Sequence, residues 1–272
     1  MGSIVGDAHM HLFGLNEKIF GEKRDDSLKK YTNYFKDYDV KTAFIVYNNE
    51  SRLNDLKNEC KKQEIDVDIR GFYWIKDINN YEIPKNADAI KFESYIDDID
   101  ICDIQKILDS DELNLPVYIH CGELKSELSN PLKVEQLAKM YPERKFIIGH
   151  SGTYGPPIDK KYFTGLSVIE NIKDAIRVAS ELENVYLETS ILNCDVKLDL
   201  IVKNRDKLKY KLLLGSDFPL TIGDILEGRI SISEELETLQ PTIKSQEELL
   251  LNAGVPVETI NQFYRNIKTF FD

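Results

Sequence analysis

Residues 115–150 read LPVYIHCGELKSELSNPLKVEQLAKMYPERKFIIGH, with two short apolar runs on either side of one helical pattern. The runs Val117–His120 and Phe146–His150 are almost continuously apolar, which is typical of parallel strands buried on both faces. Between them, Asn130 followed by Pro131 predicts a helix N-cap with proline in the first turn. This stretch therefore predicts a strand, a helix and a second strand.

The same unit recurs along the chain. Six further apolar runs bring the number of predicted strands to eight, at Ser3–Asp7, Thr42–Tyr47, Ile69–Trp74, Ala89–Phe92, Val185–Glu188 and Leu212–Gly215. Eight strands that alternate with helices over 272 residues indicate a (β/α)8 TIM barrel. An open doubly wound sheet is the competing architecture, but it usually carries a GxGxxG turn after its first strand, and the sequence has no such motif.

Several local signals refine this pattern. Ser167 with Glu170, and Ser245 with Glu248, have the spacing of a capping box and predict two helix starts. The connection after Ile69–Trp74 is too short for a regular helix and contains a proline. Because no linker rich in Pro, Gly or Ser divides the chain, we expect one domain over residues 1–272.

The composition excludes several classes of protein. With 42% hydrophobic and 30% charged residues, the chain is suited to a packed core and not to disorder. Apolar runs of about 18 residues are missing, as is the pattern of a secretory signal, so we expect no membrane association. The net charge of -12 disfavours binding to nucleic acid. The four cysteines form no CxxC pair, which favours a reduced, cytoplasmic protein.

The four histidines are the strongest functional signal. His9, His11, His120 and His150 are the only histidines, and each lies at the carboxyl end of a predicted strand, as does Asp217. A single histidine in such a place is usually a hydrogen-bonded structural residue. Four together are different, because the carboxyl ends of barrel strands meet at one mouth, where the active sites of such barrels lie.

These side chains suit a metal ion. Neutral imidazoles and one carboxylate are ligands that zinc prefers, and such a set leaves a position for water or a substrate oxygen. A bound cation would lower the pKa of that water and polarise a carbonyl group.

The chain resembles the amidohydrolase superfamily, and within it the amidohydrolase-related branch (amidohydrolase 2) that includes aminocarboxymuconate semialdehyde decarboxylase. The matching pieces occur in the order of the family and span most of the chain: DAHMHLF (7–13), VYIHCGE (117–123), FIIGHSG (146–152), NVYLETS (184–190) and LLLGSDFP (212–219). The tail from Gly254 also resembles the last helix of that branch.

The resemblance implies roles for these residues. His9, His11, His120 and Asp217 would hold one divalent ion, Zn²⁺ or else Mn²⁺, with Asp217 and His150 as the catalytic residues. In relatives with two ions, the histidines of the fifth and sixth strands share the second ion, and a residue of the fourth strand bridges both. Here Lys91 or Glu93 would be that bridge, although the two could equally form a structural ion pair.

Other residues near the predicted strand ends are weaker candidates. Lys91, Glu123 and Tyr154 are predicted to contact substrate, although a solvated carboxylate is the plainer interpretation of Glu123. One of the aromatic pair 73–74 would line the pocket or pack in the core, and Cys121 is expected to be a packing residue. Ser190 matches the family motif without a defined role.

Four functions remain open from the sequence. The first is a metal-dependent hydrolase of a small amide, ester or lactone, and the second is a decarboxylase or hydratase of a small carboxylic acid. A decarboxylase needs a cation for the substrate carboxylate, and only Lys91 among the motifs offers one, which favours hydrolysis. A nuclease of the TatD type and a barrel that only binds a ligand are the remaining alternatives. The resemblance also implies a small-molecule substrate and a tendency to form homo-oligomers.

Long connections follow three of the predicted strands, at Leu12–Arg24, Ser151–Leu166 and Phe218–Ser245. All three lie on the side of the barrel where substrate would bind. They are either a lid over the substrate or ordinary surface insertions.

Overall fold

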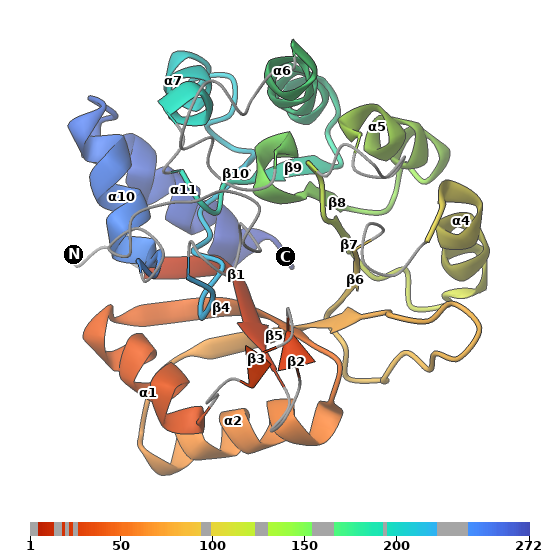
Figure 1. Ribbon diagram of the computed structural model, residues 1–272, viewed down its shortest axis with the longest axis vertical. Helices are drawn as coiled ribbons and strands as arrows, with labels where there is room; N and C mark the ends of the chain where they lie inside the picture. Colours follow the sequence, from red (N-terminus) through yellow and green to blue (C-terminus); the bar gives the residue numbers. More distant parts are fainter. Residues whose placement is uncertain are drawn as a thin grey trace.

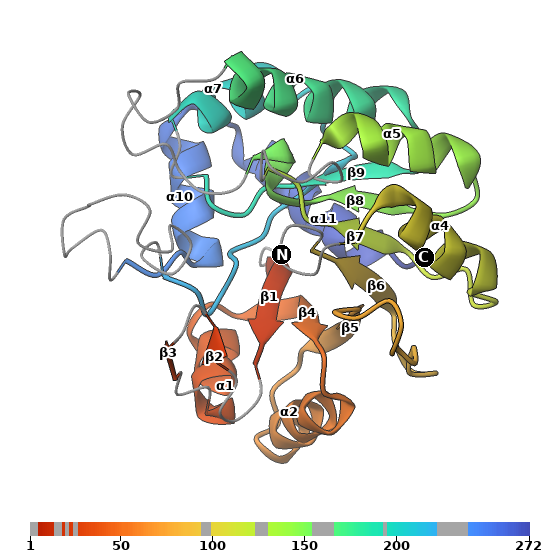
Figure 2. The same ribbon diagram turned by 45° about the vertical axis from the view of Figure 1, so that its right-hand side comes forward.

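Eight parallel strands form one sheet that curls into a nearly closed barrel with helices outside it (Figures 1 and 2). This computed structural model describes residues 5–13, 18–19, 22–23, 27–93, 99–122, 130–153, 166–192, 195–221 and 239–272. The strands follow one another around the sheet in chain order: β1 (Val5–Leu12), β4 (Val40–Tyr47), β5 (Asp68–Trp74), β6 (Ala89–Phe92), β7 (Val117–Ile119), β8 (Phe146–Ile148), β9 (Val185–Glu188) and β10 (Leu212–Leu213). The predicted (β/α)8 barrel is confirmed.

Backbone hydrogen bonds between the first strand and the segment after the last strand close the barrel. The Ala8 N–H donates to the Leu214 carbonyl (2.7 Å), and the Asp217 N–H donates to the His9 carbonyl (2.8 Å). The His11 N–H donates to the Phe218 carbonyl (2.7 Å). The seam of the barrel therefore runs through the residues that the sequence assigns to the site.

The helices surround the barrel in chain order, from α1 and α2 at the bottom of Figure 1 through α4, α5 and α6 to α10 at the left. Their bounds are α1 (Leu28–Asp37), α2 (Glu50–Lys62), α4 (Ile101–Ser110), α5 (Pro131–Met140), α6 (Leu166–Glu181), α7 (Asp195–Lys203), α10 (Ile243–Asn252) and α11 (Val257–Thr269). A short strand pair, β2 (Lys18–Ile19) and β3 (Glu22–Lys23), follows β1. Residues 75–88 between β5 and β6 contain no helix, as predicted.

Two of the predicted helix starts can be checked. The Asn130 side chain accepts a hydrogen bond from the Leu132 N–H (2.9 Å) ahead of Pro131, which confirms the cap of α5. The predicted cap at Ser245 is wrong. Thr242 caps α10 instead, because its hydroxyl accepts from the Ser245 N–H while the Ser245 hydroxyl accepts from the Thr242 N–H. The side chain of Ser167 lies outside the described residues.

The predicted end of the first strand is also wrong. The sequence ended it at Asp7, whereas β1 continues to Leu12, so that His9 and His11 lie inside the strand. The reason is that the residues after Asp7 pair with β4 on one side and with the seam segment on the other. The predicted strand Phe146–His150 is in turn too long. β8 stops at Ile148, and a 3-10 turn over Gly149–Gly152 carries His150.

Helices α5 and α6 are joined by an ion pair that stabilises the outer layer. Both terminal nitrogens of Arg177 donate to the Glu135 carboxylate (2.7 and 3.3 Å), and Lys139 donates to it as well. These hydrogen bonds, chiefly that of Arg177, lower the pKa of Glu135 to about 2.

We therefore expect Glu135→Gln to lower the free energy of unfolding at pH 7. The Arg177 side chain is 38% exposed, so solvent screening limits the loss to about 1 kcal/mol. The folded-state pKa of Glu135 lies below its unfolded value, so the stabilisation is complete above pH 4.5 and fades as the pH falls toward 2. Urea unfolding at pH 7 and pH 3.5 checks this, with the exposed Glu112→Gln as the control. The same difference in the free energy of unfolding between wild type and Glu135→Gln at both pH values would contradict this prediction.

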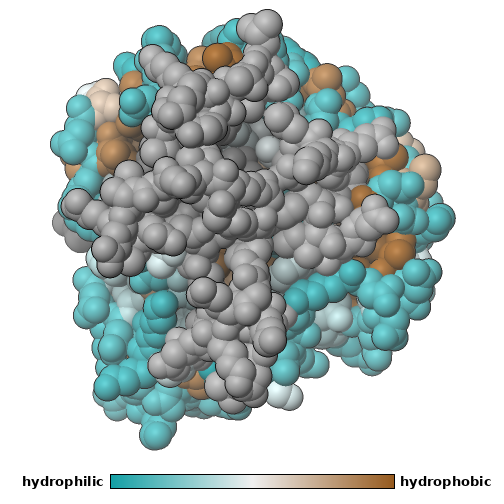
Figure 3. Space-filling view, viewed as in Figure 1, coloured by the Kyte–Doolittle hydropathy of each residue, from teal (hydrophilic) through white to brown (hydrophobic). Residues whose placement is uncertain are grey.

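The described surface is mainly polar. Figure 3 shows hydrophilic residues over most of the described part of this face, with separate hydrophobic patches at its edge. The most exposed large apolar side chains, Leu113, Tyr210 and Val257, come from different elements, as is ordinary for a protein surface. None of the described helices combines the length and the apolar character that crossing a membrane requires.

Candidate active site

The structure brings most of the predicted site residues to the carboxyl ends of the barrel strands. All of them are buried: His9 and His11 on β1, Lys91 on β6, Glu93 just after β6, His120 after β7, His150 after β8 and Asp217 after β10. Glu123 and Tyr154 lie outside the described residues, as do large parts of the three long connections.

One cluster within this site joins the two histidines of β1 to Asp217. The His11 Nε2 atom lies 3.1 Å from Asp217 Oδ1, and the His9 Nδ1 atom lies 3.6 Å from the same oxygen. The Nζ atom of Lys91 lies 3.1 Å from His9 Nε2 and 3.3 Å from His11 Nε2. The two Nε2 atoms thus converge on one point, where the lysine places a cation.

This donor set fits a divalent cation. Ligand atoms of His9, His11 and Asp217 lie within 4.8 Å of one another, and all three side chains are buried. A metal ligand must be a neutral imidazole, and burial, with the charge of Lys91 next, lowers the pKa of His9 well below 6.5. A divalent ion would use the same Nε2 lone pairs that face Lys91, so the ion and the ammonium compete for them.

Lys91 is also paired with Glu93. Its Nζ forms an ion pair with Glu93 Oε1, and both side chains are almost fully excluded from solvent. The two residues lie two apart and point the same way, as their spacing predicts. Of the two roles that the sequence left open, the structure has the ion pair.

His120 lies beside His150 and not in the cluster of His9, His11 and Asp217. Its Nδ1 atom is 3.1 Å from His150 Nε2, and the ring centroids are 4.4 Å apart. Burial lowers the pKa of both imidazoles well below the usual value, so both are neutral near pH 7. The ring of His150 in turn lies 5.0 Å from that of His9, which links the pair to the cluster.

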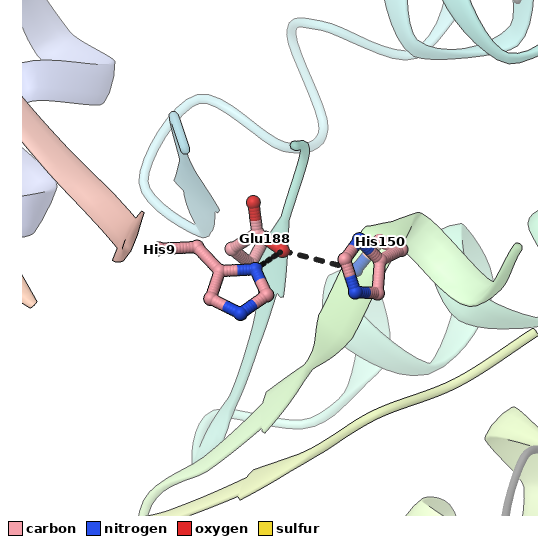
Figure 4. A group of neighbouring side chains, drawn as sticks. All are labelled: His9, His150 and Glu188. Atoms are coloured by element: carbon pink, nitrogen blue, oxygen red, sulfur yellow. Dashed lines mark hydrogen bonds and ion pairs between the residues drawn. The ribbon is translucent and has the colours of Figure 1, made fainter. Parts of the chain in front are cut away.

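A second group with metal-like geometry contains Glu188. Figure 4 shows this carboxylate, on β9, between the ring of His9 and the turn that carries His150. Its Oε2 atom accepts hydrogen bonds from the His150 N–H (3.0 Å) and from the hydroxyls of Tyr118 (2.8 Å) and Ser190 (3.0 Å). The Ser190 N–H donates to Oε1. Because four donors already use these oxygens, this group is less suited to a cation than the cluster of His9, His11 and Asp217.

The backbone is strained at the same place. His150, Ser151, Ile191 and Asp217 all have positive φ values between 51° and 66°. Such conformations cost of order 1–3 kcal/mol each for a residue with a side chain, and they cluster at functional sites. Their concentration beyond the ends of these strands is consistent with a functional site in this region.

Four buried polar residues of this region were not identified from the sequence as functional. Glu188, Tyr118 and Ser190 form the network described above, although the last was noted without a role. Lys197 of α7 is fully buried and donates to the Ser190 carbonyl (2.9 Å). Glu188 stands in the family-matching piece NVYLETS (184–190), which assigned it no role, and Lys197 lies outside the matching pieces, so the fold reveals what each residue contacts.

Asp7 anchors the seam beneath the site. Its carboxylate accepts hydrogen bonds from the Ser216 N–H (3.0 Å) and hydroxyl (2.6 Å) and from the Tyr34 hydroxyl (2.7 Å). It thereby fixes the segment that carries Asp217. Burial raises the pKa of Asp7 to about 7, against the opposing effect of these donors.

The weaker candidates separate clearly. Trp74 faces the site, with its ring 5.8 Å from Lys91 Nζ, whereas Tyr73 packs against Tyr47. Cys121 is fully buried, and burial raises the pKa of its thiol well above the usual range, which suits a packing role.

Comparison with known proteins supports the fold and the family. The chain superimposes on a probable 2-pyrone-4,6-dicarboxylic acid hydrolase from Acinetobacter baumannii with citric acid bound, at a TM-score of 0.65 and 13% identity over 98% of each chain. It also matches a zinc-bound amidohydrolase from Burkholderia multivorans (TM-score 0.59, 12% identity, 98% of each chain). An amidohydrolase 2 from Bifidobacterium longum subsp. infantis matches with a TM-score of 0.59 and 16% identity, over 98% of this chain and 97% of that one.

At these identities the solved structures support the barrel alone. Curated protein sequences contain no significant match to the chain. The model of the family described as Amidohydrolase, however, matches residues 111–250, which is more than half of the chain and includes His120, His150, Glu188 and Asp217. The protein is therefore an enzyme of the amidohydrolase family.

Proposed function

We propose that this enzyme hydrolyses a small amide, ester or lactone with the help of one divalent cation held by His9, His11 and Asp217. The observation that carries the proposal is the convergence of His9 Nε2 and His11 Nε2 beside the Asp217 carboxylate. Zinc is the ion that best suits two imidazoles and a carboxylate, and manganese is the alternative. The family resemblance also predicts His120 as a ligand; it lies beside His150, outside this cluster.

The cation would supply Lewis acidity, which lowers the pKa of a water molecule and polarises the substrate carbonyl. The protein supplies the proton transfers and the positions. Asp217 accepts the proton of the attacking water, because its carboxylate is an acceptor beside the cluster. His150 stabilises the negative charge that develops on the substrate oxygen or donates to the leaving group.

Hydrolysis is favoured over decarboxylation by the charges of the site. A decarboxylase must hold a substrate carboxylate with a cation. Lys91 is already paired with Glu93, and the other buried lysine of the described site, Lys197, donates to a backbone carbonyl. A decarboxylase or hydratase on the same site therefore remains the second candidate. Lys91 as a substrate contact belongs to that alternative.

A panel of small lactones, esters and amides tests the reaction, alongside small carboxylic acids assayed for release of carbon dioxide. We expect hydrolysis of at least one class by the protein loaded with zinc or manganese, and its loss after treatment with chelator. Release of carbon dioxide without hydrolysis would favour the second candidate. Full hydrolytic activity in protein shown to be free of metal would contradict the proposed role of the cation.

A further inference from the structure

Two hydroxyl groups lie between the Glu188 carboxylate and two of the imidazoles. The Tyr118 hydroxyl donates to Glu188 Oε2, and its oxygen lies 3.0 Å from His9 Nδ1. The Ser190 hydroxyl donates to the same carboxylate oxygen and lies 2.7 Å from His150 Nδ1. Each hydroxyl has one proton, and an ionised carboxylate only accepts. Once that proton is directed at Glu188, the hydroxyl oxygen must accept an N–H from the neighbouring imidazole.

Lys91 imposes the same requirement on His9 from the opposite side of the ring. Its ammonium lies 3.1 Å from His9 Nε2 and has donors only, so Nε2 must accept. A neutral imidazole has one acceptor nitrogen and one donor nitrogen. Two independent contacts of His9 thus place its proton on Nδ1.

The tautomer of His150 determines the tautomer of His120. With the proton of His150 on Nδ1, its Nε2 atom is an acceptor, and that atom lies 3.1 Å from His120 Nδ1. His120 must then donate from Nδ1, which leaves the lone pair of its ring on Nε2. The chain of contacts from Glu188 through Ser190 and His150 therefore ends on the Nε2 atom of His120.

We propose that Glu188 is the positioning residue that holds His150 and His120 in the Nδ1–H form, and that it shares this role with Lys91 at His9. The two predicted metal ligands of this set, His9 and His120, then each offer an Nε2 lone pair. The proposal rests on the proposed function only in assigning those lone pairs to a metal, because the tautomers follow from the hydrogen bonds alone. Partners that orient a ligating imidazole in this way commonly raise metal affinity.

Two glycines make room for this network, which is a separate sign that the fold is built around it. A Cβ atom at Gly215 would overlap Glu188 Oε1 and lie 2.9 Å from the Cβ atom of His9. A Cβ atom at Gly149 would lie 2.5 Å from the Tyr118 hydroxyl oxygen. A side chain at either position would push the carboxylate or the hydroxyl away from the histidines.

Nitrogen NMR of the metal-free protein tests the proposal directly, because the chain has only four histidines. Long-range proton–nitrogen correlation of ¹⁵N-histidine protein reports which ring nitrogen carries the proton, and single histidine variants assign the signals. We expect the Nδ1–H form for His9, His120 and His150. In Glu188→Gln an amide donor faces N–H and O–H donors, so we expect the Nδ1–H signals of His150 and His120 to be lost, whereas Lys91 still requires the Nε2 atom of His9 to accept. The exposed Glu183→Gln is the matched control and should leave all four patterns unchanged.

Variants of the two hydroxyls separate the two branches of the network. Tyr118→Phe should alter the signal of His9 and leave those of His150 and His120 unchanged. Ser190→Ala should alter the signals of His150 and His120, and also that of His9, because the Ser190 hydroxyl lies 3.3 Å from His9 Nδ1. Tyr47→Phe is the control, since the buried Tyr47 hydroxyl has no hydrogen-bond partner among the described residues. These variants keep the test decisive if Glu188→Gln does not fold.

Metal affinity provides the second readout. We expect the dissociation constant for zinc to rise roughly 10- to 100-fold in Glu188→Gln, as measured by competition with a chelating dye. Nε2–H forms of His9 and His150 in the wild-type protein, or an unchanged tautomer of His150 in Glu188→Gln, would overturn the proposal. Failure to hydrolyse any substrate of the panel would leave the NMR result standing and count against the proposed function alone.

Discussion

Asp217→Asn is expected to lower kcat at least about 10³-fold, with a much smaller change in KM. The substitution removes a proton acceptor, and positioned general bases contribute typically 10²–10⁴-fold to the rate. It also weakens the cation site, because an amide is a poorer ligand for zinc than a carboxylate. Asparagine tolerates positive φ as aspartate does, so the φ of 66° at this position adds no new strain. The loss is therefore chemical and not a consequence of misfolding.

Steady-state kinetics on the best substrate of the panel measure this effect. The control is Asp206→Asn, at a side chain that is 88% exposed and forms no part of the cluster. Circular dichroism and thermal unfolding establish that both variants are folded. A folded Asp217→Asn protein that keeps more than about a tenth of the wild-type kcat would rule out Asp217 as the proton acceptor.

Lys91→Met is expected to lower the free energy of unfolding of the metal-free protein by about 3–5 kcal/mol. The change leaves the Glu93 carboxylate buried without its cation, and breaking a buried ion pair from one side has a cost of this size. Replacing both partners, in Lys91→Met with Glu93→Leu, should recover most of the loss, because an apolar pair needs no compensating charge.

Urea unfolding in the presence of chelator measures the four proteins of this double-mutant cycle without a contribution from bound metal. Lys203→Met, which breaks an exposed ion pair with Asp199, should change stability by less than about 1 kcal/mol. If Lys91 is instead a bridging ligand, Lys91→Met will lose bound metal while the metal-free protein remains as stable as the wild type. That outcome would favour a two-metal site bridged by Lys91 over the ion pair with Glu93.

The barrel was predictable because parallel strands buried on both faces have almost continuously apolar sequences, which few other elements share. Val117–His120 and Phe146–His150 are apolar throughout, and a helix with a clear cap separates them. The convergence of His9, His11 and Asp217 follows from the same property, since the strands of a barrel end at one mouth. Position along a strand was therefore enough to bring these residues together.

The boundaries were less predictable, because some depend on pairing partners that are distant in sequence and others on a choice between neighbouring caps. β1 extends to Leu12 because β4 pairs with it on one side and the segment 214–218 hydrogen-bonds to it on the other. The start of α10 moved to Thr242 because its hydroxyl and that of Ser245 cap each other. Tertiary pairing therefore set the end of β1, whereas at α10 a local capping box starting three residues earlier prevailed over the one predicted at Ser245.

Glu188 escaped prediction for a related reason. Only Ser190, two residues beyond the end of β9, is a local donor; the others come from β7 and from the turn after β8, and no spacing in the sequence connects those segments to Glu188. Lys197 lies on a helix, where a lysine is ordinarily interpreted as a solvated side chain. Residues that support a site through contacts across the barrel are visible only once the barrel is built.

The number of metal ions bound per chain tests the central claim most directly. Mass spectrometry of protein purified without chelator, and again after reconstitution with zinc or manganese, measures this number for the wild type and for Asp217→Asn. We predict about one equivalent in the wild type and a large loss in the variant. Two equivalents in the wild type, or none in well-folded protein after reconstitution, would contradict a single cation held by His9, His11 and Asp217.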